Sequence, residues 1–346
     1  MKLLSFLFPA PIAGLFMAGC QTSGGSGAAS AIIFAREESG GRAYYIQDAG
    51  GSGAPAALPV PASAGNLRTA PRAGIAAATI GASGAGEAEL RLIALGAAGG
   101  SERSLAREWA WDYSLGAEGE AIAWIAGRDR RELFVARAPE WKPAALALPV
   151  EAEPGQPRWL ARDRLLVVLR WKAGGEALAL AGGAGGAEVI YRAVGRAVLS
   201  EACGIPGSAD VLVIESPEGD SPGRLLRIAI EGGQPEVLAH GFFLPGTLAV
   251  SPDGRFVGAV WSEAAAAVRR GEAAWRWIGA AWPGAPESVP GVVSAVWSPD
   301  GSRLAFARRG EGRRWIEVHG SEPGRPRRVG FEEAECFAPQ WWRIAR

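Results

Sequence analysis

Short apolar runs alternate with polar, glycine-containing turns along nearly the whole chain, and two of these turns are identical. The tetrapeptide Ser-Pro-Asp-Gly occurs at 251–254 and again at 298–301, each time between two short apolar segments. Proline fixes φ near the value that a tight turn needs, aspartate accepts hydrogen bonds from nearby backbone N–H groups, and glycine tolerates a positive φ. The pattern therefore predicts turns between β-strands. We assign a structural role in these turns to Pro252, Asp253, Gly254, Pro299, Asp300 and Gly301.

The segment that follows the second turn recurs upstream with a nearly constant period. Residues 118–136 match residues 300–318 without a gap, and residues 31–46 repeat the same pattern. Positions equivalent to Phe306 are separated by 43, 47, 43, 46, 46 and 47 residues. A period in the forties built from β-hairpins is typical of four-stranded propeller blades. The equivalent positions are Phe34, Ala77, Trp124, Val167, Val213, Ala259 and Phe306.

These units predict an all-β fold, a seven-bladed β-propeller of four-stranded antiparallel blades that spans residues 31–346. The first unit begins directly with its second strand at residue 31, and residues 336–346 have the pattern of an isolated innermost strand. We therefore expect the ring to be closed by the C-terminal strand, with residues 337–342 paired beside residues 32–34. Closure of this kind removes a free sheet edge, which otherwise invites aggregation.

The Ser-Pro-Asp-Gly turn followed by an apolar strand resembles the repeat of the TolB-like β-propeller superfamily. The resemblance covers residues 31–346, although only the last two full units carry the motif intact. TolB itself differs from this prediction because its propeller has six blades. The resemblance therefore implies the fold much more than it implies an activity.

The first thirty residues have the composition of a secretion and anchoring signal. A lysine at position 2 precedes an apolar run from 3 to 17, and small residues stand before Cys20, which predicts a signal peptide over residues 1–19. Residues 17–20 also resemble the bacterial lipobox, which implies that Cys20 is lipidated. A membrane-spanning helix is the alternative, but the run is short and contains Pro9 and Pro11. Residues 20–30 are rich in glycine and serine and predict a flexible tether.

A lipidated cysteine implies a bacterial envelope protein that touches the membrane only through its lipid. Gln21 follows Cys20 in place of the aspartate that retains lipoproteins in the inner membrane of enteric bacteria, so we expect the outer membrane, facing the periplasm. Cys203 and Cys336 are the remaining cysteines, and one disulfide is possible by count. The repeat register sets them far apart around the ring, so we expect two separate buried thiols.

Composition limits the classes of partner and chemistry. Lysine plus arginine equals aspartate plus glutamate at 36 each, which provides no net field to attract nucleic acid. His240 and His319 are the only histidines, and neither has a cysteine or histidine at ligand spacing, so we expect no metal site and no cofactor. The sequence also has no G-x-S-x-G elbow paired with an acid and a histidine, and no phosphate-binding loop.

Fourteen tryptophans are the most unusual feature of the composition. One group of aromatic residues falls on the predicted innermost strands of two units, near the ring axis. Packing in the core and recognition at a surface are both open for this group, because tryptophan and tyrosine serve both purposes. The candidate binding residues are Trp109, Trp111, Tyr113, Trp341 and Trp342.

Two classes of function follow from these observations. The favoured one is a non-catalytic, monomeric envelope lipoprotein whose propeller binds an envelope protein or peptide, since the sequence has a rigid scaffold, many aromatic residues and no assembled catalytic set. The alternative is a propeller hydrolase or lactonase-like enzyme with a carboxylate or metal site in its central channel. The identity of the partner or substrate has no signature in the sequence.

Overall fold

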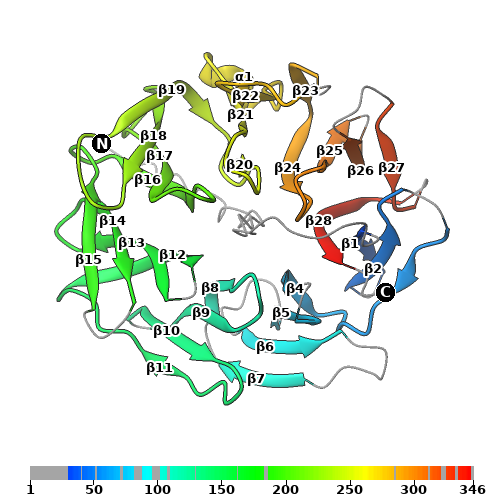
Figure 1. Ribbon diagram of the computed structural model, residues 1–346, viewed down its shortest axis with the longest axis horizontal. Coiled ribbons are helices and arrows are strands. Elements are labelled where there is room, and N and C mark those ends of the chain that lie inside the picture. Colours follow the sequence, from blue (N-terminus) through cyan, green and yellow to red (C-terminus); the bar gives the residue numbers. More distant parts are fainter. Residues whose placement is uncertain are drawn as a thin grey trace, which may run out of the picture.

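The computed structural model describes residues 30–39, 41–50, 53–70, 73–81, 88–95, 102–106, 110–128, 130–161, 163–182, 186–283, 286–310, 312–320, 325–331 and 334–343. These residues form antiparallel sheets that are arranged radially around one axis, as Figure 1 shows. Within these ranges the single helix is α1, Ala265–Arg269. No helix in this part of the chain is long and apolar enough to cross a bilayer. The signal peptide, Cys20 and nearly all of the tether lie outside the described residues.

Five of the sheets have four strands each. In the sheet ordered β28–β1–β2–β3, the strands are Cys336–Arg343, Ser30–Glu38, Gly41–Asp48 and Ala56–Ala57. Strands β4 to β7 are Ala64–Ala70, Ile75–Ile80, Glu89–Ala94 and Glu102–Ala106. Strands β8 to β11 are Ala110–Leu115, Ala121–Ala126, Glu132–Arg137 and Ala144–Ala145. Strands β12 to β15 are Ala152–Ala161, Arg164–Trp171, Glu176–Ala181 and Ala187–Arg192, and β24 to β27 are Val292–Trp297, Arg303–Gly310, Arg313–Gly320 and Arg327–Val329.

The remaining strands form one eight-stranded sheet, where two separate four-stranded sheets were expected. Strands β16 to β19 are Val198–Gly204, Asp210–Ser216, Gly223–Ala229 and Glu236–Phe243, and β20 to β23 are Ala249–Val250, Val257–Ser262, Ala274–Ile278 and Ser288–Pro290. The two sets join where Phe243 pairs with Trp261. Pro245 lacks an N–H and Gly246 has a φ of 88°, so the chain turns there and β20 has only two residues. The end of β19 takes the vacated place beside β21.

The repeat period read from the sequence is confirmed by the positions of the strands. The seven positions equivalent to Phe306 lie in seven different strands, and each is exposed by 2% or less because a neighbouring sheet covers it. In each set this strand is the second from the axis, as Figure 1 shows. The strands concerned are β1, β5, β9, β13, β17, β21 and β25.

The two ends of the described chain meet in one sheet. Strand β28 pairs antiparallel with β1, so that Trp341 lies opposite Ile32 and Gln340 lies opposite Ile33. Figure 1 shows β28 in red beside β1 in blue. The indole Nε1 of Trp341 donates to the backbone oxygen of Val296 in β24 at 2.9 Å, which ties β28 to the preceding sheet.

Side chains within the Ser-Pro-Asp-Gly turns stabilise the turns themselves. Oδ1 of Asp253 accepts the hydroxyl of Ser251 at 2.5 Å and the N–H of Arg255 at 3.1 Å. Gly254 has a φ of 72°, which favours glycine. The second turn repeats this arrangement through Asp300. Both carboxylates therefore accept hydrogen bonds within their own turns.

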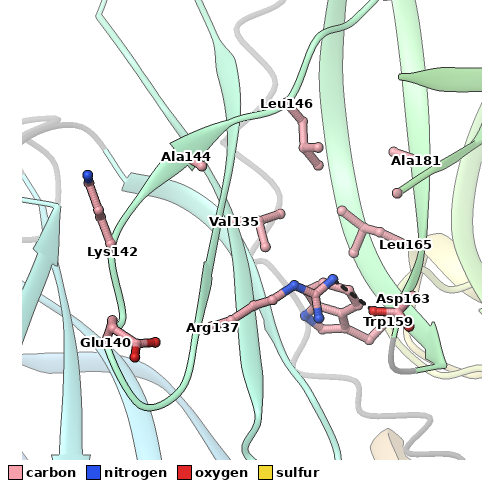
Figure 2. Close-up of a pocket in the computed structure, with 11 residues that line it drawn as sticks. Val135, Arg137, Glu140, Lys142, Ala144, Leu146, Trp159, Asp163, Leu165 and Ala181 are labelled. Atoms are coloured by element: carbon pink, nitrogen blue, oxygen red, sulfur yellow. Dashed lines mark ion pairs between the residues drawn. The ribbon is translucent and has the colours of Figure 1, made fainter. Parts of the chain in front are cut away.

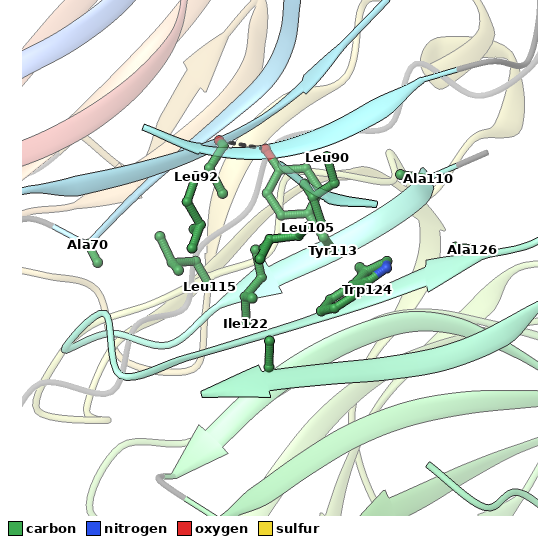
Figure 3. Close-up of a cluster of buried hydrophobic side chains, with 12 residues drawn as sticks. Ala70, Leu90, Leu92, Leu105, Ala110, Tyr113, Leu115, Ile122, Trp124 and Ala126 are labelled. Carbon is green, nitrogen blue, oxygen red and sulfur yellow. Dashed lines mark hydrogen bonds between the residues drawn. The ribbon is translucent and has the colours of Figure 1, made fainter. Parts of the chain in front are cut away.

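The hydrophobic core lies between neighbouring sheets rather than at the axis. Figure 3 shows one such cluster, in which Leu90 and Leu92 of β6 face Tyr113 of β8 and Trp124 of β9. The buried hydroxyl of Tyr113 donates to the backbone oxygen of Ala77 at 2.9 Å, so the phenol also ties the two sheets together. Apolar burial of this kind is the main source of stability between blades.

Candidate functional site

The aromatic residues singled out near the axis are in part core residues. Tyr113 and Trp341 are only 1% and 5% exposed, and packing between sheets, the alternative left open above, accounts for both. Trp342 is half-buried and packs against the cluster shared by β1 and β4. Trp109 and the side chain of Trp111 lie outside the described residues. A role in recognition remains a prediction for this group.

The two later cysteines are placed as expected. Cys203 lies in β16 and Cys336 in β28, two strands of different sheets. Both thiols are buried, and no disulfide joins them. Burial raises the pKa of the Cys336 thiol, which disfavours the reactive thiolate.

A cavity of about 490 Å³ opens between the sheet of β8 to β11 and the sheet of β12 to β15. Figure 2 shows its lining, which is mainly apolar along one side and charged at the edge. Its volume lies within the usual range for ligand pockets, about 300–1,000 Å³. Apolar lining comes from Val135, Ala144, Leu146, Leu165 and Ala181, and charged lining from Arg137, Glu140, Lys142 and Asp163.

Trp159 of β12 forms one wall of this pocket, and two hydrogen bonds to Ser114 fix its position. Its backbone N–H donates to Oγ of Ser114 at 3.2 Å, and its indole Nε1 donates to the Ser114 backbone oxygen at 3.0 Å. The guanidinium of Arg137 lies 5.4 Å from the Trp159 ring centroid, within cation–π range. Arg137 also pairs with Asp163 at 3.4 Å, a contact that Figure 2 marks. The wall is thus rigid, whereas the charged rim is largely exposed.

Sequence reasoning missed this pocket. Arg137 and Trp159 belong to different repeat units, and nothing in their local sequence indicates that they meet. Trp159 does stand on an innermost strand, as Trp342 does, so extending the repeat register to the innermost strands would have drawn attention to it.

A second polar feature, called the polar chain below, consists of charged side chains that link the innermost strands of consecutive sheets. Asp112 of β8 lies between two arginines, with 3.4 Å to Nη2 of Arg68 in β4 and 3.4 Å to Nη1 of Arg158 in β12. Further along, the carboxylate of Glu201 in β16 accepts the backbone N–H of Leu248 at 3.1 Å. These side chains link one innermost strand to the next near the axis.

Two side chains of the polar chain have strongly shifted pKa values. Burial raises the pKa of the Glu201 carboxyl to about 7, even though backbone N–H groups and Arg158 act in the opposite direction. Burial and the neighbouring charge of Arg158 lower the pKa of the Arg68 guanidinium to about 10. Two guanidinium groups here share the carboxylate of Asp112.

Across the described ranges, no three histidine, cysteine, aspartate or glutamate side chains group closely enough to hold a metal ion.

Comparisons with known proteins identify the fold. No family profile matches the sequence, and no curated protein matches it. TolB from Acinetobacter baumannii is similar in structure, with 14% identity, a TM-score of 0.52 and coverage of 90% of this chain and 82% of that one. An oligogalacturonate lyase in complex with manganese has 13% identity, a TM-score of 0.58 and coverage of 89% and 87%.

A prolyl endopeptidase structure is also similar, with 11% identity and a TM-score of 0.63. The match covers 95% of this chain and 51% of that one, so this chain spans about half of the endopeptidase. Identities this low establish the fold alone. The chain has a TolB-like β-propeller fold, and this fold also occurs in enzymes.

Proposed function

We propose that the sheets form a closed ring of seven blades. The seven buried repeat positions support this count, because each lies in its own set of strands around the axis. The sets β16 to β19 and β20 to β23 count as two blades, since only the end of β19 bridges them. The pairing of β28 with β1 supports closure by the C-terminal strand.

The N-terminal segment leads to a proposal about location. The propeller is a lipoprotein, held by lipidated Cys20 at the outer membrane of a bacterial envelope, and it faces the periplasm. The lipobox-like sequence at 17–20 and the glycine- and serine-rich residues after it support this proposal. At least two acyl chains give stable anchoring, since one chain alone holds only marginally.

Replacement of Cys20 by serine should release the protein from the membrane fraction. Serine cannot form the thioether to which the lipid is attached, so the apolar anchor is lost. Fractionation and immunoblotting of cells that express Cys20→Ser or the parent chain measure the effect. Ser23→Ala, three residues further along the predicted tether, is the matched control and should stay membrane-bound. Retention of Cys20→Ser on the membrane would contradict lipid anchoring.

The function that the geometry supports best is binding of an envelope protein or peptide by a non-catalytic, monomeric scaffold. The pocket between β8 to β11 and β12 to β15 carries this proposal. Its apolar lining, its fixed Trp159 wall and its charged rim have the arrangement of a protein-binding hot spot, an apolar anchor site surrounded by polar groups. An apolar side chain of the partner enters the pocket, and its neighbours meet Arg137 and Asp163 at the rim.

Two adjacent alanines of the short strand β11 allow a matched test of this pocket. Ala144 pairs with Val135 and lines the pocket, whereas Ala145 pairs with Phe134 and faces the other side of the sheet. Both alanines are exposed, so glutamate at either position disturbs no core packing. Ala144→Glu should lower partner recovery from solubilised envelope about tenfold, which corresponds to about 1.4 kcal/mol. Ala145→Glu should recover the partner as the parent chain does.

The pull-down also decides whether this pocket is the binding surface. Equal recovery by Ala144→Glu and the parent chain would exclude it. Equal losses with the two glutamate variants would also count against the pocket, because only one of the two residues lines it.

An enzyme with a channel carboxylate is the second candidate, and Glu201 is the observation that favours it. A half-buried carboxyl with a pKa near 7 is suited to general acid–base catalysis. However, its carboxylate already accepts the Leu248 N–H, and its own N–H donates to Oε1 of Gln156 at 2.9 Å. These bonds assign Glu201 a role in joining strands, so binding remains the preferred function.

A further inference from the structure

The innermost strands share a bulge that places a polar residue at the same point in five sheets. Each of these strands carries one extra residue relative to its partner strand, and such bulges redirect the side chains beside them. The first paired residue beyond the irregularity, on its C-terminal side, is polar or charged in these five strands. These residues are Arg68 of β4, Asp112 of β8, Arg158 of β12, Ser294 of β24 and Gln340 of β28.

Two of the five polar groups lack a partner. Arg68, Asp112 and Arg158 are joined by the ion pairs described above. Nε2 of Gln340 and Oγ of Ser294 have no hydrogen-bond partner among the described residues, and the two residues are only 3% and 8% exposed. Buried polar atoms in folded proteins are nearly always hydrogen-bonded, so an unpartnered buried amide indicates a missing ligand or water.

The two residues with unpartnered atoms lie on innermost strands that are neighbours around the axis. Strand β28 contacts β24 on one side and β4 on the other, an order that Figure 1 also shows. Gln340 is therefore on the strand between those of Ser294 and Arg68. The guanidinium of Arg68, which pairs with Asp112, therefore lies on the strand next to that of Gln340.

We propose that Nε2 of Gln340, the hydroxyl of Ser294 and the guanidinium of Arg68 form a site for a carboxylate at the ring axis. A carboxylate offers acceptors to two donors that lack one, and its negative charge is favoured beside a guanidinium. Asp112 and Arg158 keep side-chain exposures of 21% and 17%, so the polar chain is open to solvent beside the site. The site stands apart from the pocket between the sheets, and its test does not depend on a protein partner.

Selective labelling makes the site directly observable, because the sequence contains only five glutamines. The full-length protein with ¹⁵N-glutamine is titrated with N-acetylglycine, which carries a terminal carboxylate, and with the α-amide of N-acetylaspartate, which carries only a side-chain carboxylate. The neutral control is N-acetylglycinamide. A carboxylate should shift the Gln340 side-chain signal until the shift saturates. The compound that binds more tightly shows whether the site prefers a terminal or a side-chain carboxylate. The Gln47 amide, which donates to Gly53, should not move.

Two substitutions complete the test. Gln340→Met keeps the volume and removes the unpartnered donor, so it should melt about 2 °C higher without ligand and lose binding in ligand-observed NMR. It also assigns the Gln340 signal. Ser294→Ala should weaken N-acetylglycine binding several-fold and remains informative if the first variant folds poorly. If neither carboxylate changes the chemical shift of the Gln340 side chain, as expected if only water fills the site, the proposal is overturned. An equal shift with N-acetylglycinamide overturns it as well.

Discussion

Deletion of residues 336–346 should leave an insoluble or poorly folded product. The deletion removes β28, uncovers the paired edge of β1 and takes away Trp341, which is 5% exposed. Truncating a buried aromatic residue alone costs about 3–5 kcal/mol, and most domains have only about 5–15 kcal/mol in total. The exposed edge of β1, a strand that contains Ile32 and Phe34, also promotes aggregation. Soluble yield and melting temperature, compared with the parent chain, measure the loss.

A complementation experiment separates the loss of the strand from general damage. A synthetic peptide of residues 336–346, added during refolding, should restore solubility because β28 contributes mainly through pairing with β1 and packing against β24. A peptide in which Trp341 is replaced by alanine serves as the matched control and should restore less. A truncated chain that stays soluble with an unchanged melting temperature would refute closure by the C-terminal strand and the count of seven blades.

Gly258→Ala should be strongly destabilising, although the change adds only one methyl group. Gly258 is buried in β21, and a Cβ there would overlap the indole ring of the fully buried Trp275 on β22. The ring belongs to a cluster of aromatic residues and cannot move without displacing Phe306, whose centroid lies 5.0 Å away. Overpacking of this kind costs about 1–3 kcal/mol, and we expect the upper end of that range. Chemical denaturation measures the change.

Gly65→Ala is the matched control for this substitution. Gly65 also lies in a strand, but its new Cβ would meet Oγ1 of Thr79 at 3.4 Å, an ordinary contact. Its stability should change by less than about 0.5 kcal/mol. In a double-mutant cycle, Trp275→Phe should relieve part of the cost of Gly258→Ala, because the smaller ring leaves room for the methyl group. Purely additive losses in that cycle would refute a direct clash with the indole.

Most of the fold could be predicted because its signals are local. The second strand of each set is buried on both faces, so residues such as Val167 and Val213 must be apolar, and the sequence repeats that requirement at each period. Turn chemistry is equally local, since Asp253 bonds to residues two positions away on either side. The pairing of β28 with β1 was also predictable, because the first unit lacked an innermost strand and the last segment resembled one.

The joined sheet at β19 and β21 shows where local signals end. Both strands were expected, but their pairing depends on how Pro245 shortens the next innermost strand and on which neighbour then reaches the vacant edge of β21. Which strand pairs with β21 therefore depends on the tertiary structure and not on local sequence. The aromatic residues near the axis are another case, because core and surface positions have the same composition, and only burial distinguishes Tyr113 and Trp341 from an exposed binding group.

The sequence by itself determined the repeat, the strand order within each set and the residues of the turns, because each depends on bonds or burial within one period of the chain. Only the tertiary structure decided the two candidate sites. The pocket wall exists because Trp159 bonds to Ser114, 45 residues earlier. The polar chain exists because Asp112 of β8 pairs with Arg68 of β4 and Arg158 of β12. A contact between units requires a particular side chain on each of two distant strands, and each side chain satisfies the pattern of its own strand whether or not its distant partner is present.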